Sequence, residues 1–213
     1  MILPPGAPPA LAQVAQRFVQ SSRGVTTARL HRIFDVHGGF SSRHEDLVIR
    51  VVYESGTLVR VRVESYSING RPASPADIAS VERSWNHPNP SDVFAPPYDP
   101  RHLAEYQYQQ TAASTIGFSS NVNDAGHGRG SFTYDAAGNV ISISYQPNVL
   151  PPHASSGQII DLRGQVLPGY WAAEQETQSY RGSYGPFAAA GTIQVTYSDF
   201  HRFPNLSTAL LSL

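Results

Sequence analysis

The sequence contains no cysteine, which excludes a disulfide framework and a thiolate metal site. It contains no lysine either, so its basic residues apart from histidine are all arginines. No apolar run approaches the roughly 20 residues that a membrane-spanning helix needs. The formal net charge is −1, which gives no electrostatic basis for binding a nucleic acid.

The length of 213 residues, 40% of them hydrophobic, suits one domain of the larger all-β or α+β kind, or two small domains. We expect the proline-rich residues 1–8 to be a flexible tether and residues 9–213 to be a single domain. The opening MILPPGAPPALAQ lacks the positive and apolar regions of an intact signal peptide. It suits either the mature N-terminus of an exported protein or a cytoplasmic N-terminus.

Two segments show the helical spacing of apolar residues. The first spans residues 9–22 and is followed by Gly24 as a stop. Its apolar face contains Leu11, Val14, Ala15 and Phe18. The second begins at Ser74, which serves as the N-cap, with Pro75 at N1 and Asp77 at N3. Its apolar face contains Ile78, Val81 and Trp85.

Strand-like segments occupy most of the remaining chain, and several are joined by turn sequences such as Ser55-Gly56. Because strands do not alternate with helices, we expect an antiparallel sheet. Residues 85–102 are dense in proline and predict a long irregular loop that is functional or mobile. The predicted strands are 26–37, 46–54, 57–66, 104–111, 114–119, 131–147 as a hairpin, 157–171, 173–184 and 191–203.

The histidines do not form a convincing metal site in the sequence. His31, Asp35 and His37 share one strand face, but they spread over about 20 Å at ~3.3 Å per residue, too far for one ion. His127 lies in AGHGRG, which matches no phosphate-binding motif and predicts a loop that needs positive φ angles. We therefore predict no metal site and no cofactor.

The sequence also shows no catalytic constellation. It has neither a G-x-S-x-G elbow nor a cysteine nucleophile, although a dispersed triad of serine, histidine and an acid stays open. Glu174 and Glu176 share one strand parity and predict a solvated face. We predict a non-enzymatic protein, with a hydrolase as an alternative.

Aromatic side chains recur through the predicted strands, from Tyr106 and Tyr108 to Tyr197 and Phe203. They would form an ordinary core in a tightly closed barrel. They would line a cavity if the sheet curves without closing. Both interpretations stay open at the level of the sequence.

The order of these elements resembles the periplasmic lipoprotein-carrier superfamily, the LolA/LolB-like fold that also includes the N-terminal domain of RseB/MucB. The resemblance lies in the helix LAQVAQRFVQSSRGV, the strand ARLHRIFDV, the hairpin DLVIRVVYESGTLVRVRVES and the insertion INGRPASPADIASVERSW. It continues in the strands GNVISISYQP and GTIQVTYSDFHRF and covers most of 9–203.

The resemblance implies an α+β fold in which a strongly curved antiparallel sheet forms an unclosed β-barrel. The N-terminal helix and an inserted lid helix, residues 75–85, would cover its open side over an apolar cavity. The residues that we expect to line this cavity and its lid are Phe34, Val59, Val61, Val63, Ile78, Val81, Trp85, Tyr106, Tyr108, Ile141, Ile143, Tyr145, Trp171, Val195 and Tyr197.

The resemblance further implies a periplasmic or otherwise exported monomer that carries or senses a lipid, an acyl chain or a lipidated protein. An envelope protein partner and a peripheral contact with the membrane are open within this interpretation. The alternative is a protein-interaction or stress-sensing module of the envelope with a filled core. Residues 86–102 would then be its contact surface.

Overall fold

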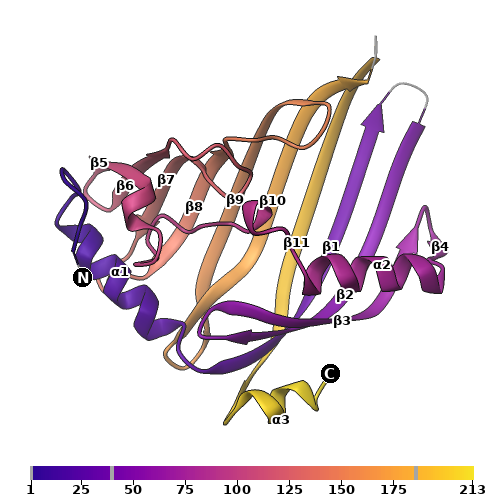
Figure 1. Cartoon of the computed structure of the whole chain (residues 1–213), viewed down its shortest axis with the longest axis horizontal. Coiled ribbons are helices and arrows are strands. Elements are labelled where there is room, and N and C mark those ends of the chain that lie inside the picture. Colours follow the sequence, from indigo (N-terminus) through magenta and orange to yellow (C-terminus); the bar gives the residue numbers. More distant parts are fainter. Residues whose placement is uncertain (1, 39–40, 185–186) are drawn as a thin grey trace.

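The structure is a computed structural model, and it describes residues 2–38, 41–184 and 187–213. Eleven strands form one antiparallel sheet in the order β4-β3-β2-β1-β11-β10-β9-β8-β7-β6-β5 (Figure 1). The strands are β1 (Val25–Gly38), β2 (Ser41–Glu54), β3 (Thr57–Ile68), β4 (Arg71–Pro72), β5 (Tyr106–Ala112), β6 (Thr115–Ser120), β7 (Gly128–Tyr134), β8 (Val140–Pro147), β9 (Ala154–Leu167), β10 (Tyr170–Tyr184) and β11 (Phe187–Phe203). The predicted unclosed antiparallel sheet with helices is confirmed.

The strand order explains why a helix and a long loop interrupt the strands. Strands β4 and β5 are consecutive in the chain but form the two opposite edges of the sheet. The chain must therefore cross the width of the sheet between them. It does so with helix α2 (Pro75–Asn86), two short 3-10 helices, η1 (Pro90–Asp92) and η2 (Leu103–Glu105), and the irregular chain around them. We call residues 87–105 the crossing segment.

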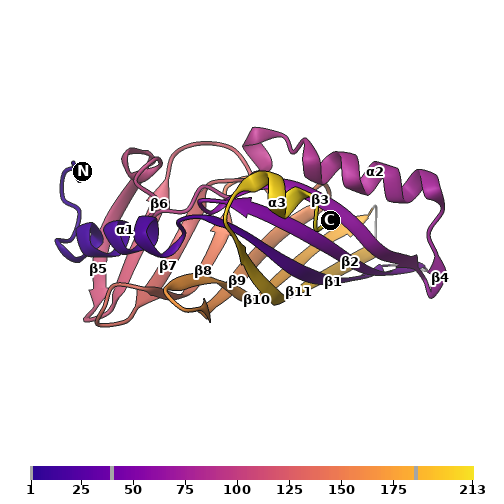
Figure 2. The same ribbon diagram turned by 90° about the horizontal axis from the view of Figure 1, so that it is seen from below.

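Helix α1 (Ala10–Ser21), helix α2 and the crossing segment lie on the concave side of the sheet (Figures 1 and 2). Two apolar clusters result. The β5–β9 core joins α1 and the crossing segment to the sheet through Leu11, Val14, Ala15, Tyr98, Leu103, Tyr106, Ile116, Phe118, Phe132, Val140, Ile143, Tyr145 and Ile159. The β1–β3 core is formed by Ala28, Leu30, Leu47, Ile49, Val51, Val61, Tyr66 and Val195, with α2 packed against it.

Helix α2 begins as the sequence predicts and covers the free edge of β3. The Ser74 hydroxyl accepts from the Asp77 N–H, and the Asp77 carboxylate accepts from the Ser74 N–H, which completes a capping box. Asn86 accepts from the Val61 N–H at 2.7 Å and donates to the Val61 carbonyl at 3.1 Å. Glu82 accepts from the Val63 N–H at 2.8 Å. These side chains satisfy backbone groups that an edge strand otherwise leaves open.

The structure corrects several predicted elements. Residues 204–213 contain helix α3 (Leu206–Leu210), which the sequence analysis missed. The boundary between the strands predicted at 157–171 and 173–184 lies instead at Pro168-Gly169, where Gly169 has a φ of +68°. Among the helices in the described ranges, none is both long and apolar enough to span a bilayer.

Described residues of the predicted tether contact the rest of the chain. Leu3 and Ala7 pack against the β5–β9 core, and Pro8 is buried. Residue 1 of the tether lies outside the described residues. The division of the chain into a tether and one domain stays a prediction.

Candidate ligand-binding site

A cavity of about 760 Å³ lies on the concave face. It lies where the C-terminal ends of β1 and β10 and the N-terminal end of β11 meet the β8–β9 connection. Its wall is mostly apolar and includes Phe34, Val36, Pro151, Tyr180, Ala189 and Ile193. The volume falls within the range of pockets that hold small ligands, about 300–1,000 Å³.

The alternation of side chains along the strands creates this cavity. Phe34 pairs with Ile193 and Val36 pairs with Gly191 across β1 and β11, so these residues share the concave face. Gly191 also lies opposite Tyr180 of β10, and Gly182 lies opposite Ala189. The small residues at these inward positions leave space that larger side chains would fill.

A row of polar side chains leads inward from the cavity along β10. Tyr180 donates to the Gln178 amide oxygen at 2.8 Å, and Gln178 donates to the Glu176 carboxylate at 2.6 Å. Burial raises the pKa of Glu176, against the opposing effect of the bond from Gln178. The prediction that Glu174 and Glu176 share a solvated face is therefore wrong for Glu176. A bulge between Ala173 and Gln175 breaks the alternation of side chains on which that prediction rested.

A buried ion pair continues this polar row beneath the crossing segment. The Arg163 guanidinium lies 3.0 Å from the Asp161 carboxylate, with side chains 15% and 9% exposed. Burial raises the pKa of Asp161 despite its charged neighbour. The ring of Tyr98 lies 5.9 Å from the same guanidinium, and burial raises the Tyr98 pKa to about 12. Among the described residues, no partner is found for the Tyr98 hydroxyl.

The residues predicted for the cavity are divided among several places. Phe34 lines the cavity, and the others are not among its described lining residues. Val61, Val63, Ile78, Val81, Trp85, Val195 and Tyr197 belong to the β1–β3 core or pack against it. Tyr106, Tyr108, Ile143 and Tyr145 belong to the β5–β9 core or pack against it.

Bulges explain two departures from strand parity. Ile141 is 39% exposed, because the pairing of β7 with β8 shifts register beside it and turns Val140 and Ile143 to the same face. The prediction that Ile141 lines a cavity is wrong. Val59 lies at the register shift between β2 and β3 and is half-buried, as is Trp171 on β10.

The crossing segment fills the concave face at the β5–β9 end. The ring of Phe94 stacks on Tyr145 with centroids 4.7 Å apart, and Tyr98 packs edge-on against Phe18 and Phe132. Ala95, Tyr98 and Asp99 are buried. The concave face is therefore filled over β5–β9, whereas the cavity lies at the ends of β1, β10 and β11. The second half of residues 86–102 is not the exposed contact surface that the alternative interpretation expected.

The histidines lie in two settings. His31 bonds Asp46 at 3.0 Å and His44 bonds Asp35 at 2.7 Å, as separate pairs rather than one site. His127 is 8% exposed and bonds two carboxylates. The glycines beside it do not have positive φ angles, so that part of the loop prediction is wrong. A Cβ on Gly126 would lie 2.2 Å from the Val93 carbonyl oxygen, which shows that close backbone approach requires glycine there.

The cavity wall also contains Ile193 and Ala189, which were not predicted from the sequence, and Tyr180 and Phe187, which belong to the strand aromatics but not to the predicted cavity residues. Strand parity could have found Ile193, since it shares the parity of Val195 and Tyr197, which were predicted. Tyr180 could not be found in this way, because its relation to the cavity depends on the pairing of β10 with β11.

No family model matches the chain, and no curated protein matches it. Solved structures are similar to it over most of its length. A domain from Vibrio parahaemolyticus described as an outer membrane lipoprotein-sorting protein is 12% identical, with 92% of each chain covered and a TM-score of 0.45. A DUF1329 family protein from Desulfovibrio piger is 9% identical, with 94% of each chain covered and a TM-score of 0.43.

The MucA/MucB complex of Pseudomonas aeruginosa is similar at 9% identity, with 92% of this chain and 98% of that chain covered and a TM-score of 0.22. The solved structures similar to this chain thus include one described as a lipoprotein-sorting protein domain and one described as a MucA/MucB complex. At these identities the likeness concerns the arrangement of the chain and says nothing of a ligand or a partner.

Proposed function

We propose that this protein is a non-enzymatic binding protein of the cell envelope that holds an acyl chain, from a lipid or a lipidated protein, in the cavity beside Phe34. The observation that carries the proposal is a mostly apolar cavity of about 760 Å³ on the concave face of an unclosed sheet. Phe34, Val36 and Ile193 offer apolar surface to an acyl chain, and Arg181 and His153 are the basic residues of the same wall.

The partial packing of helix α2 supports the proposal that this helix is a movable cover over the neighbouring concave face. None of its residues is buried, and Ile78, Val81 and Trp85 pack against the β1–β3 core only in part. Side-chain bonds from Glu82 and Asn86 to β3 fasten it to the sheet. In this proposal the helix moves as a unit on the β3 edge when a chain longer than the cavity extends along the sheet.

The experiment measures the affinity of the full chain for saturated fatty acids of increasing length, by displacement of a fluorescent fatty acid. Each methylene that enters the cavity contributes about 0.8 kcal/mol, which corresponds to roughly a fourfold gain in affinity. The affinity should rise with each added methylene until the cavity is full.

Ala189→Trp places an indole in the cavity and should lower the affinity for the longest bound chain at least tenfold. Ala188→Trp is the matched control, because Ala188 is the adjacent residue of β11 and is not among the lining residues. The proposal fails if no chain length binds, or if Ala189→Trp and Ala188→Trp bind every chain as the unchanged protein does.

A further inference from the structure

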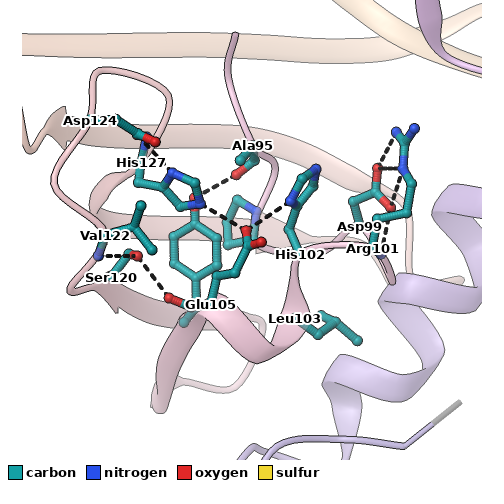
Figure 3. Close-up of polar contacts among 12 residues, drawn as sticks. Ala95, Asp99, Arg101, His102, Leu103, Glu105, Ser120, Val122, Asp124 and His127 are labelled. Atoms are coloured by element: carbon teal, nitrogen blue, oxygen red, sulfur yellow. Dashed lines mark hydrogen bonds and ion pairs between the residues drawn. The ribbon is translucent and has the colours of Figure 1, made fainter. Parts of the chain in front are cut away.

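Three side chains of the types that ligate metals, His102, Glu105 and His127, converge from two parts of the sequence beside the β5–β9 core (Figure 3). One oxygen of Glu105, Oε2, lies 2.8 Å from His102 Nδ1 and 2.8 Å from His127 Nε2. The ligand atoms of the three residues all lie within 4.8 Å of one another. Two imidazole nitrogens and a carboxylate thus face one point.

The backbone holds these residues in place. His102 and Glu105 are three residues apart at the two ends of η2, and side chains at this spacing eclipse each other in a 3-10 turn. His127 is brought to them by pairing of its loop with the crossing segment. The Gly126 N–H donates to the Ser91 carbonyl at 2.8 Å, and the Ala95 N–H donates to the Gly126 carbonyl at 2.9 Å.

A second carboxylate orients the buried histidine. Asp124 Oδ1 lies 2.7 Å from His127 Nδ1 and also accepts the His127 backbone N–H at 2.8 Å (Figure 3). A carboxylate faces each ring nitrogen, so a proton lies between Nε2 and Glu105 as well, and a bound ion would replace that proton while Asp124 keeps the one on Nδ1. A carboxylate that holds Nδ1–H while Nε2 takes the ion is how proteins orient metal-ligating histidines.

We propose that His102 Nδ1, His127 Nε2 and the Glu105 carboxylate bind one divalent transition-metal ion such as Zn²⁺, with water as a fourth ligand. Imidazole nitrogens favour zinc and its neighbours over magnesium and calcium, which prefer oxygen ligands. At metal–ligand distances of about 2.0–2.2 Å, tetrahedral ligand atoms lie about 3.3–3.6 Å apart. The Glu105 side chain, 37% exposed, needs to withdraw by about 0.5–0.8 Å to admit the ion.

The ion would join the crossing segment to the connection between β6 and β7. The crossing segment lies across the concave face, so a metal there would hold the filled end of the sheet together while the cavity end stays open. This inference does not depend on whether the cavity binds an acyl chain, since the two sites share no residue.

The test uses tag-free protein stripped with EDTA, titrated with Zn²⁺ and followed by native mass spectrometry and calorimetry. We expect one ion per chain. Co²⁺ in place of Zn²⁺ should give the intense visible absorption of a four-coordinate site. Asp124→Asn should weaken binding about 10–100-fold, because it removes the carboxylate that orients His127.

His102→Ala should abolish stoichiometric binding, and it leaves the fold intact because the His102 side chain is 30% exposed. Glu105→Gln provides a second variant that keeps the shape of the side chain but removes its charge. His44→Ala is the matched control, since His44 also bonds a carboxylate, Asp35, at 2.7 Å. The inference is overturned if the unchanged protein binds no Zn²⁺, or if His102→Ala and Glu105→Gln bind it as tightly as His44→Ala.

Discussion

The attachment of helix α2 to the edge of β3 can be tested with one substitution, Asn86→Ala. The Asn86 amide bonds both the N–H and the carbonyl of Val61, at 2.7 and 3.1 Å. These bonds take the place of those that a neighbouring strand would make with Val61. Alanine removes both bonds and adds none.

The expected loss of stability follows from those two bonds. A typical hydrogen bond contributes about 0.5–1.5 kcal/mol net, so we expect the free energy of unfolding to fall by about 1–3 kcal/mol. Alanine is also the better helix former, by less than about 0.7 kcal/mol, and this effect acts in the opposite direction. Any destabilisation therefore reports the lost contact with β3 rather than a weaker helix.

The assay combines urea unfolding with amide hydrogen exchange. Exchange at the Val61 and Val63 amides should accelerate more than exchange in the centre of the sheet, because the change frees an edge rather than the whole fold. Ser84→Ala is the control, since the Ser84 hydroxyl bonds only the Val81 carbonyl of its own helix among the described contacts. Unchanged unfolding and unchanged exchange at Val61 in Asn86→Ala would refute the argument that α2 is fastened through this amide.

Two further predictions concern the sheet. Gly130→Ala should destabilise the protein by about 1–3 kcal/mol in thermal unfolding, because its Cβ would lie 2.0 Å from the Ser144 carbonyl oxygen. A Cβ at Gly117 would lie 3.1 Å from the Thr111 methyl group, which belongs to a flexible side chain, so Gly117→Ala should lower the stability less. Equal losses of stability in the two variants would contradict the steric reason. Although burial opposes it, bonds from Arg29 and Arg50 lower the pKa of Glu64 below its ordinary 4.5. A lowered pKa stabilises the fold above the unfolded value, so this contribution is present above about pH 4.5 and is lost as the pH falls through the folded pKa. Glu64→Gln should reduce the acid loss of stability measured in urea between pH 5 and pH 3 (approximate bounds), and an unchanged pH profile would contradict this.

Local signals in the sequence were sufficient for most elements. The Ser74 to Asp77 capping box predicted the start of α2, and the strand-like residues 57–66 predicted β3. Both depend on contacts within a few residues, which a sequence pattern records directly. Bulges were not predictable in this way, because one extra residue in a strand is visible only against its partner strand. This is why Ile141 was placed on the wrong face.

The sequence by itself determined the class of fold. It contains successive strand-like segments, two amphipathic helices and a long proline-rich segment that predicts irregular chain. It also excluded thiolate ligands and disulfides, because it lacks cysteine. These conclusions follow from composition and local periodicity alone.

Only the tertiary structure decided where the concave face is filled and where the cavity lies. That outcome depends on β4 and β5 being opposite edges, so that the chain between them must cross the sheet and bury Tyr98 at one end. The same crossing brings His102 and Glu105 to His127, more than twenty residues away in sequence. Strand order and register determine such long-range contacts, and both arise from the packing of residues far apart in the chain.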